Sequence, residues 1–117
     1  MQNRPTAEEL LVAVREFLQG TVMPELTGRV AFHARVAVNV LAIVERELAQ
    51  GPAAAATEQR ELAALLGHDG DLLTLNRELS AAIRRGDFDG RETPLIDLLK
   101  RSVGAKLAID NPRYAGD

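Results

Sequence analysis

Four side chains that could take part in catalysis or ligand binding lie within one apolar stretch, "GRVAFHARVAVNVLAIVERE", at residues 28–47. His33 could serve as a general base or a metal ligand, because an imidazole titrates near neutral pH. Arg35 and Arg46 could hold a carboxylate or a phosphate, and Asn39 could orient such an anion by hydrogen bonds. These four residues are the first members of the candidate ligand or partner site.

On a helix, the four side chains separate into two groups. At about 100° per residue, Arg35, Asn39 and Arg46 lie at roughly 300°, 340° and 320° from Phe32. His33 lies at roughly 100°, in the middle of an arc of large apolar residues, and we therefore expect it to be buried. A core histidine, hydrogen-bonded to a carbonyl or a neighbouring helix, is favoured over a catalytic base. No second catalytic group stands at helical spacing from His33.

The stripe of Arg35, Asn39 and Arg46 has several interpretations. A solvated seam on an otherwise buried helix is the simplest. Small residues flank the stripe, at Ala31, Ala42 and Ala49. They would let a second helix approach closely, from the same chain or from another subunit. The arginines could instead bind an anionic ligand, over which Tyr114 of the tail "DNPRYAGD" would close unless that tail is frayed.

Other chemistry finds little support in the sequence. The chain has no Cys and only 2 His, without the spacing of a metal site, so neither a metal nor a cofactor is expected. His68, Asp69 and Asp71 are interpreted as turn and capping residues. Recognisable catalytic motifs are absent, which favours a protein that is not an enzyme.

Capping and helix-breaking residues predict a single all-α domain over residues 1–117, a bundle of about five helices. A Thr6–Glu9 capping box opens the first helix, which Gly20 ends. The second is a long central helix over about 27–50, ended by Gly51-Pro52, and the third follows it up to Gly67. The fourth spans 71–86 and the fifth 93–110. Their expected core stripes are Leu72, Leu75, Leu79 and Ile83 in the fourth, and Leu95, Leu99, Val103 and Leu107 in the fifth.

Composition and charge narrow the class of protein. Hydrophobic residues make up 46% of the 117 residues, enough for a core. The 14 basic and 17 acidic residues are interspersed, which argues against a nucleic-acid partner. The sequence "MQNRPTAEEL" lacks a signal core, and no apolar stretch is long enough to span a membrane. A soluble, cytoplasmic protein that does not bind membranes is therefore expected.

Three segments, "RPTAEELLVAVREFL", "GRVAFHARVAVNVLAIVERELAQGP" and "AKLAIDNPRYAG", resemble a small all-helical bacterial family of unknown function. Members of that family stand alone or accompany aminoglycoside-phosphotransferase-like kinases and acyl-CoA dehydrogenases. The resemblance implies a non-catalytic accessory module linked to acyl-CoA or phosphotransferase-type metabolism, with such an enzyme as a partner. The apolar central helix favours self-association, with a dimer as the favoured homo-oligomer. The alternative is a small-molecule binding protein or an uncharacterised enzyme for an anionic ligand, acyl-CoA or a phosphorylated compound.

Overall fold

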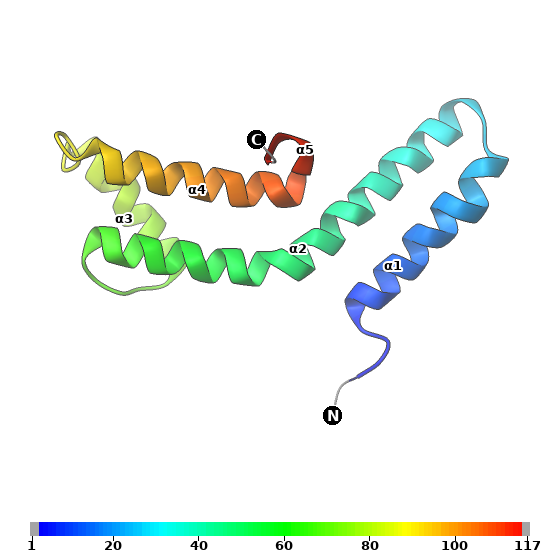
Figure 1. The fold of residues 1–117 in the computed structure, drawn as a ribbon, viewed down its shortest axis with the longest axis horizontal. Coiled ribbons are helices and arrows are strands. Elements are labelled where there is room, and N and C mark those ends of the chain that lie inside the picture. Colours follow the sequence, from blue (N-terminus) through cyan, green and yellow to red (C-terminus); the bar gives the residue numbers. More distant parts are fainter. Residues whose placement is uncertain (1–2, 116–117) are drawn as a thin grey trace. The chain divides into compact units, whose positions relative to one another are not determined.

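The structure is a computed structural model that describes residues 3–115, and it is all-α (Figure 1). Its α-helices are α1 (Ala7–Phe17), α2 (Gly28–Leu66), α3 (Leu72–Arg84), α4 (Glu92–Asp110) and α5 (Pro112–Ala115). A π-helical turn (Leu18–Val22) and a 3-10 turn (Met23–Glu25) connect α1 to α2. No strand occurs within the described range, so the predicted all-α fold class is confirmed.

Contacts divide the chain into an N-terminal unit, Met1–Gln50, and a C-terminal unit, Gly51–Asp117. Helix α2 contributes residues to both units. The single domain predicted over residues 1–117 stays a prediction.

The start of α1 follows the sequence prediction, and its end does not. The Thr6 hydroxyl accepts a hydrogen bond from the Glu9 backbone N–H (3.2 Å), and the Glu9 carboxylate accepts one from the Thr6 N–H (3.1 Å). This capping box satisfies two N–H groups that the first helical turn leaves free. Gly20 does not end the helix. It lies inside the π-helical turn with a negative φ, and the first positive φ along the chain belongs to Gly28 (66°).

The predicted break at Gly51-Pro52 is wrong, because α2 passes through both residues without interruption. The second and third predicted helices are therefore one helix. A proline inside a helix loses one hydrogen bond and clashes with the carbonyl four residues earlier, at a cost of about 3 kcal/mol. The alanines that follow it, residues 53–56, are the strongest helix formers and favour continuation.

The core of the C-terminal unit joins the end of α2 to α3 and α4. Its seven buried residues are Leu62, Leu75, Leu79, Ala82, Phe88, Leu95 and Leu98, and Leu62 and Leu75 are 0% exposed. Two side-chain hydrogen bonds join α4 to α2. Arg101 Nε donates to Glu61 (2.9 Å), and Ser102 Oγ donates to Glu58 (3.3 Å). This unit therefore has a core of its own.

The predicted core stripes of α3 and α4 are only partly correct. Leu75 and Leu79 are buried as predicted, whereas Ile83 is exposed. In α4 the buried residues are Leu95, Leu98 and Ile109, and two of the predicted core residues, Leu99 and Val103, are exposed. Steps of four residues advance about 40° beyond a full turn each time, so a stripe built only from such steps rotates away from the core.

The end of α4 and the tail after it also differ in part from the prediction. Asp110 is the last residue of α4, in agreement with the predicted end of the fifth helix at residue 110. The tail then forms the short helix α5, in which Pro112 takes the first position, where its missing N–H costs nothing. Tyr114 lies in α5 and is 73% exposed.

Candidate functional site

The predicted site residues of the N-terminal unit do not form a cluster around His33. Arg35 and Asn39 are exposed on α2, and Arg46 is half-buried. The predicted burial of His33 is wrong, because its side chain is exposed as well. The imidazole meets the neighbouring Phe32 ring edge to face, with 5.6 Å between ring centroids. Tyr114 belongs to the C-terminal unit, and the role of these five residues as a ligand or partner site stays a prediction.

His33 is exposed because α2 contacts α1 through a different face. Arg15 of α1 binds both carboxylate oxygens of Glu45, through Nε at 2.5 Å and Nη2 at 3.2 Å. The carboxylate of Glu45 raises the pKa of Arg15 further above its usual value. Val38, which is 6% exposed, lies on the same side of α2 as Glu45. On the helical wheel, Glu45 and Val38 lie at roughly 220° and 240°, far from His33 at roughly 100°.

Sequence reasoning missed the Arg15–Glu45 ion pair. The only available signal was the position of Glu45 on the helical wheel of α2. Glu45 falls there among apolar residues and apart from the stripe of Arg35, Asn39 and Arg46. A charged residue in an apolar arc usually has a partner, since an unpaired buried carboxylate is strongly unfavourable.

The large apolar side chains of the same part of α2 remain open to solvent. We name them the α2 apolar face: Val30 (60% exposed), Phe32 (56%), Val36 (44%), Val40 (51%), Val44 (39%) and Leu48 (40%). On α1, Leu10, Val14 and Phe17 are 53%, 49% and 57% exposed. Among the described residues before Gly51, Val38 alone falls in the buried class. The N-terminal unit therefore leaves these nine large apolar side chains largely exposed to solvent.

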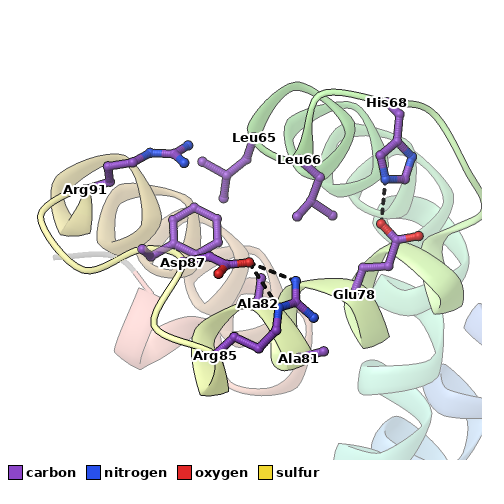
Figure 2. Close-up of a pocket in the computed structure, with 10 residues that line it drawn as sticks. Leu65, Leu66, His68, Glu78, Ala81, Ala82, Arg85, Asp87 and Arg91 are labelled. Atoms are coloured by element: carbon purple, nitrogen blue, oxygen red, sulfur yellow. Dashed lines mark hydrogen bonds and ion pairs between the residues drawn. The ribbon is translucent and has the colours of Figure 1, made fainter.

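A cavity of about 370 Å³ lies in the C-terminal unit, where the end of α2 meets α3 and the turn after it (Figure 2). Its apolar part comes from Leu65, Leu66, Ala81, Ala82 and Phe88. Its rim carries His68, Glu78, Arg85, Asp87 and Arg91. Cavities of 300–1,000 Å³ with an apolar lining and a few polar groups are the usual small-molecule sites. None of these lining residues has a hydroxyl, thiol or amine side chain, and the groups that could act as nucleophiles are the imidazole of His68 and the carboxylates of Glu78 and Asp87.

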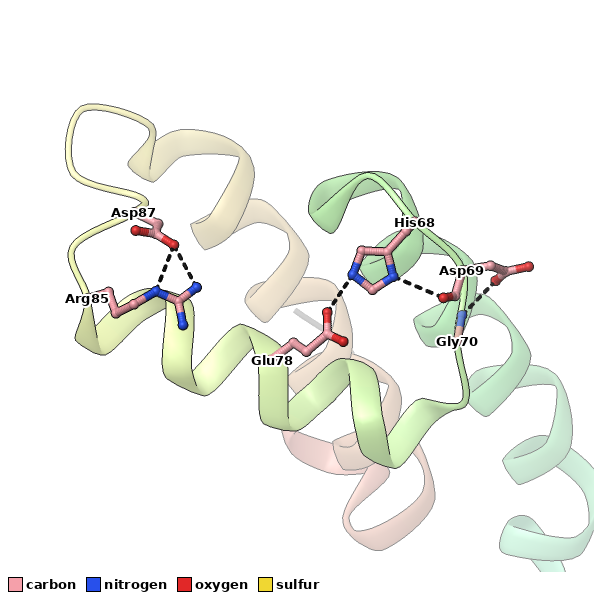
Figure 3. A network of polar contacts seen from close by, with 6 residues as sticks. All are labelled: His68, Asp69, Gly70, Glu78, Arg85 and Asp87. Atoms are coloured by element: carbon pink, nitrogen blue, oxygen red, sulfur yellow. Dashed lines mark hydrogen bonds and ion pairs between the residues drawn. The ribbon is translucent and has the colours of Figure 1, made fainter.

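His68 is held at this rim by two acceptors (Figure 3). Its Nδ1 lies 3.0 Å from the Asp69 carbonyl oxygen, and its Nε2 lies 2.6 Å from a carboxylate oxygen of Glu78. A carbonyl and a carboxylate can only accept hydrogen bonds, so this geometry favours the doubly protonated imidazolium. The Asp69 carbonyl and then the Glu78 carboxylate raise the pKa of His68 accordingly.

The prediction of capping chemistry for residues 68–71 is right for Asp71 and incomplete for His68. Asp71 accepts hydrogen bonds from the Thr74 N–H (2.8 Å) and hydroxyl (3.0 Å), which lower the pKa of its carboxyl. Glu78 lies two turns into α3, and only the fold of α3 back toward α2 brings it to His68. Helical spacing within one segment could not reveal that pairing.

Two arginines complete the rim. Arg85 binds Asp87 through Nη2 (2.8 Å) and Nε (3.2 Å). Arg91 places its guanidinium carbon 5.0 Å from the centroid of the Phe88 ring, a cation–π geometry. Both contacts lie at or near the segment between the fourth and fifth predicted helices, residues 87–92, and the sequence analysis identified neither of them.

Two other kinds of site are absent from the residues that the structure describes. Between residues 3 and 115, no group of three or more His, Asp or Glu side chains is arranged to hold a metal ion. Within the same segment, every helix is too short or too polar to cross a bilayer.

Comparison with known proteins identifies a family. No curated protein and no solved structure matches the chain. One family, described as a domain of unknown function (DUF6285), matches residues 24–114, which include α2 to α4 and the cavity. Since this match extends over well more than half of the sequence, the chain belongs to the DUF6285 family.

Proposed function

We propose that this protein is a non-catalytic helical interaction module that pairs with a second copy of itself through the α2 apolar face. The observation that carries the proposal is the exposure of six large apolar side chains on one stretch of helix. Contiguous apolar surface of this kind marks interaction sites in water-soluble proteins. By resemblance, the module is expected to accompany an acyl-CoA dehydrogenase or a phosphotransferase-like kinase, and that association is part of the proposal.

Charge at the two ends of the face supports a second copy as the partner. Arg29 and Glu47 are both exposed, and the sequence separates them by eighteen positions. At about 100° per residue, that separation is five full turns, so both lie on the same side of α2 with the apolar residues between them.

A twofold axis level with Val38 would make this face self-complementary. In an antiparallel pair of α2 helices, Arg29 of one copy then lies opposite Glu47 of the other. Phe32 lies opposite Val44 in the same arrangement, and Val36 opposite Val40. Such an isologous contact uses one patch twice, which is the commonest way for proteins to form dimers.

The area of the face fits a stable dimer. With about 150–200 Å² for a whole Val, Leu or Phe residue, the exposed fractions amount to roughly 450–500 Å² of apolar area. A standard interface buries about 800 Å² per partner, of which about 56–65% is non-polar. The apolar part of one such interface is therefore about 450–520 Å², close to the area that α2 offers.

Charge reversal followed by rescue tests the proposal. Arg29→Glu alone places two carboxylates opposite each other and should weaken the dimer, as measured by sedimentation equilibrium at micromolar concentration. The double variant Arg29→Glu/Glu47→Arg restores opposite charges and should recover the wild-type dissociation constant. Arg35→Glu, roughly 120° away on α2, is the matched control and should leave the dimer unchanged. A wild-type chain that stays monomeric at 100 µM, or a double variant no better than the single one, would refute this pairing.

A second function, binding of a small ligand by the C-terminal unit, has the cavity in its favour.

A further inference from the structure

The cavity of the C-terminal unit combines a fixed apolar floor with a charged rim. Ala82 and Phe88 are 4% and 5% exposed, so the floor is part of the packed core and keeps its shape. Leu65 and Leu66 pack against the same core and extend the floor on one side. A molecule that fills this space gains by bringing an apolar part with it.

Four of the five charges on the rim are already paired. His68 and Glu78 bind each other at 2.6 Å, and Arg85 and Asp87 at 2.8 Å. Arg91 is the fifth, and no carboxylate of residues 3–115 forms an ion pair with it. The rim therefore carries one uncompensated positive charge when His68 is protonated.

Arg91 is held in place by an aromatic ring and not by an ion pair. Its guanidinium lies over the ring of Phe88, and that ring is fixed by the core. Figure 2 shows the guanidinium reaching from its turn toward Leu65, across one end of the cavity. Stacking on a ring leaves the N–H groups at the guanidinium edge free, and a planar fork of such donors matches a carboxylate.

We propose that this cavity binds a small organic monocarboxylate, with the carboxylate on Arg91 and its apolar body against Leu65, Leu66 and Ala82. The apolar floor selects for a hydrocarbon group. Glu78 and Asp87 on the rim disfavour anions of higher charge, because a single unpaired guanidinium cannot offset two added negative charges next to two carboxylates. An acid with an aromatic ring or a short branched chain matches a cavity of about 370 Å³.

Titration followed by ¹H–¹⁵N correlation spectra tests the proposal on the full chain. The probes are benzoate, its neutral analogue benzamide, and inorganic phosphate at the same pH and ionic strength. Benzoate should give saturable shifts in residues 78–91, with benzamide and phosphate at least tenfold weaker. The absence of saturation with benzoate, or equal binding of phosphate, would overturn the proposal.

Variants separate the charge from the cavity. Arg91→Ala should weaken benzoate binding at least tenfold, and Arg91→Lys should keep only part of it because the ammonium lacks the planar fork. Ala81→Leu fills the space without changing any charge and should also abolish binding.

Arg84→Ala, which replaces an exposed arginine outside the cavity lining, is the matched control and should bind benzoate as the wild type does. Arg91 is itself exposed, so its variants should keep the unliganded spectrum of the wild type outside residues 85–95. Equal benzoate affinity of Arg91→Ala and wild type would show that the anchor is wrongly assigned. None of these outcomes depends on dimer formation by the N-terminal unit.

Discussion

Truncation of Phe32 is the sharpest test of the α2 apolar face. Phe32 is 56% exposed, which corresponds to about 110 Å² for a residue of about 200 Å². At about 25 cal/mol/Å², burial of this area is worth about 2.7 kcal/mol per copy. Phe32→Ala keeps a methyl group and so removes roughly 2–2.5 kcal/mol per copy, and a symmetric dimer contains two copies. We expect a loss of about 2–5 kcal/mol, which raises the dimer dissociation constant roughly 30- to 3,000-fold.

Phe17→Ala provides the matched control for this experiment. Phe17 is 57% exposed, so it presents as much apolar area as Phe32, but it lies on α1 and outside the proposed contact. Sedimentation equilibrium should give a wild-type dissociation constant for Phe17→Ala and a much weaker one for Phe32→Ala. Circular dichroism should report unchanged helicity for both variants. Equal effects of the two truncations, or no effect of either, would contradict the assignment of the interface to α2.

Three further predictions concern the stability of the fold. Leu75→Ala deletes a side chain that is 0% exposed and should lower the free energy of unfolding by about 2–5 kcal/mol in urea, whereas Ile83→Ala, at 43% exposure, should lower it far less. The pKa of His68 is raised in the folded protein, so the stability from its contact with Glu78 is full below the unfolded pKa and disappears as the pH rises through the folded pKa. Urea midpoints measured across that range should fall with pH in the wild type more than in His68→Gln, and parallel curves would disprove the coupling. Pro52→Ala should raise the free energy of unfolding by up to about 3 kcal/mol in thermal denaturation, because α2 is continuous at that residue. An unchanged free energy of unfolding would indicate that the helix ends there.

The sequence alone determined the local features of the fold. The Thr6–Glu9 capping box and the Asp71 cap form as predicted, since each joins groups only three residues apart. Capping and helix-breaking residues were enough to predict an all-α fold, and the spacing of Leu75 and Leu79 was enough to place both in a core. These predictions depend on contacts within one turn of helix, which the order of residues fixes directly.

The sequence did not decide whether a helix continues where helix-breaking and helix-forming residues of similar strength lie side by side. At Gly51-Pro52 the breaking residues oppose the alanine run that follows, and in the folded chain the helix continues. Local propensities of a few kcal/mol on either side cannot decide such a case, because packing of the flanking segments adds terms of the same size.

Only the tertiary structure decided which apolar surface is used and which is left open. The wheel correctly placed His33 among large apolar residues, but α1 packs against the side of α2 that holds Val38 and Glu45. The choice between two apolar sides of one helix depends on the partner helix, which the periodicity of that helix does not contain. For the same reason the cavity rim was invisible in the sequence. His68 meets Glu78 only after α3 has folded back toward the end of α2.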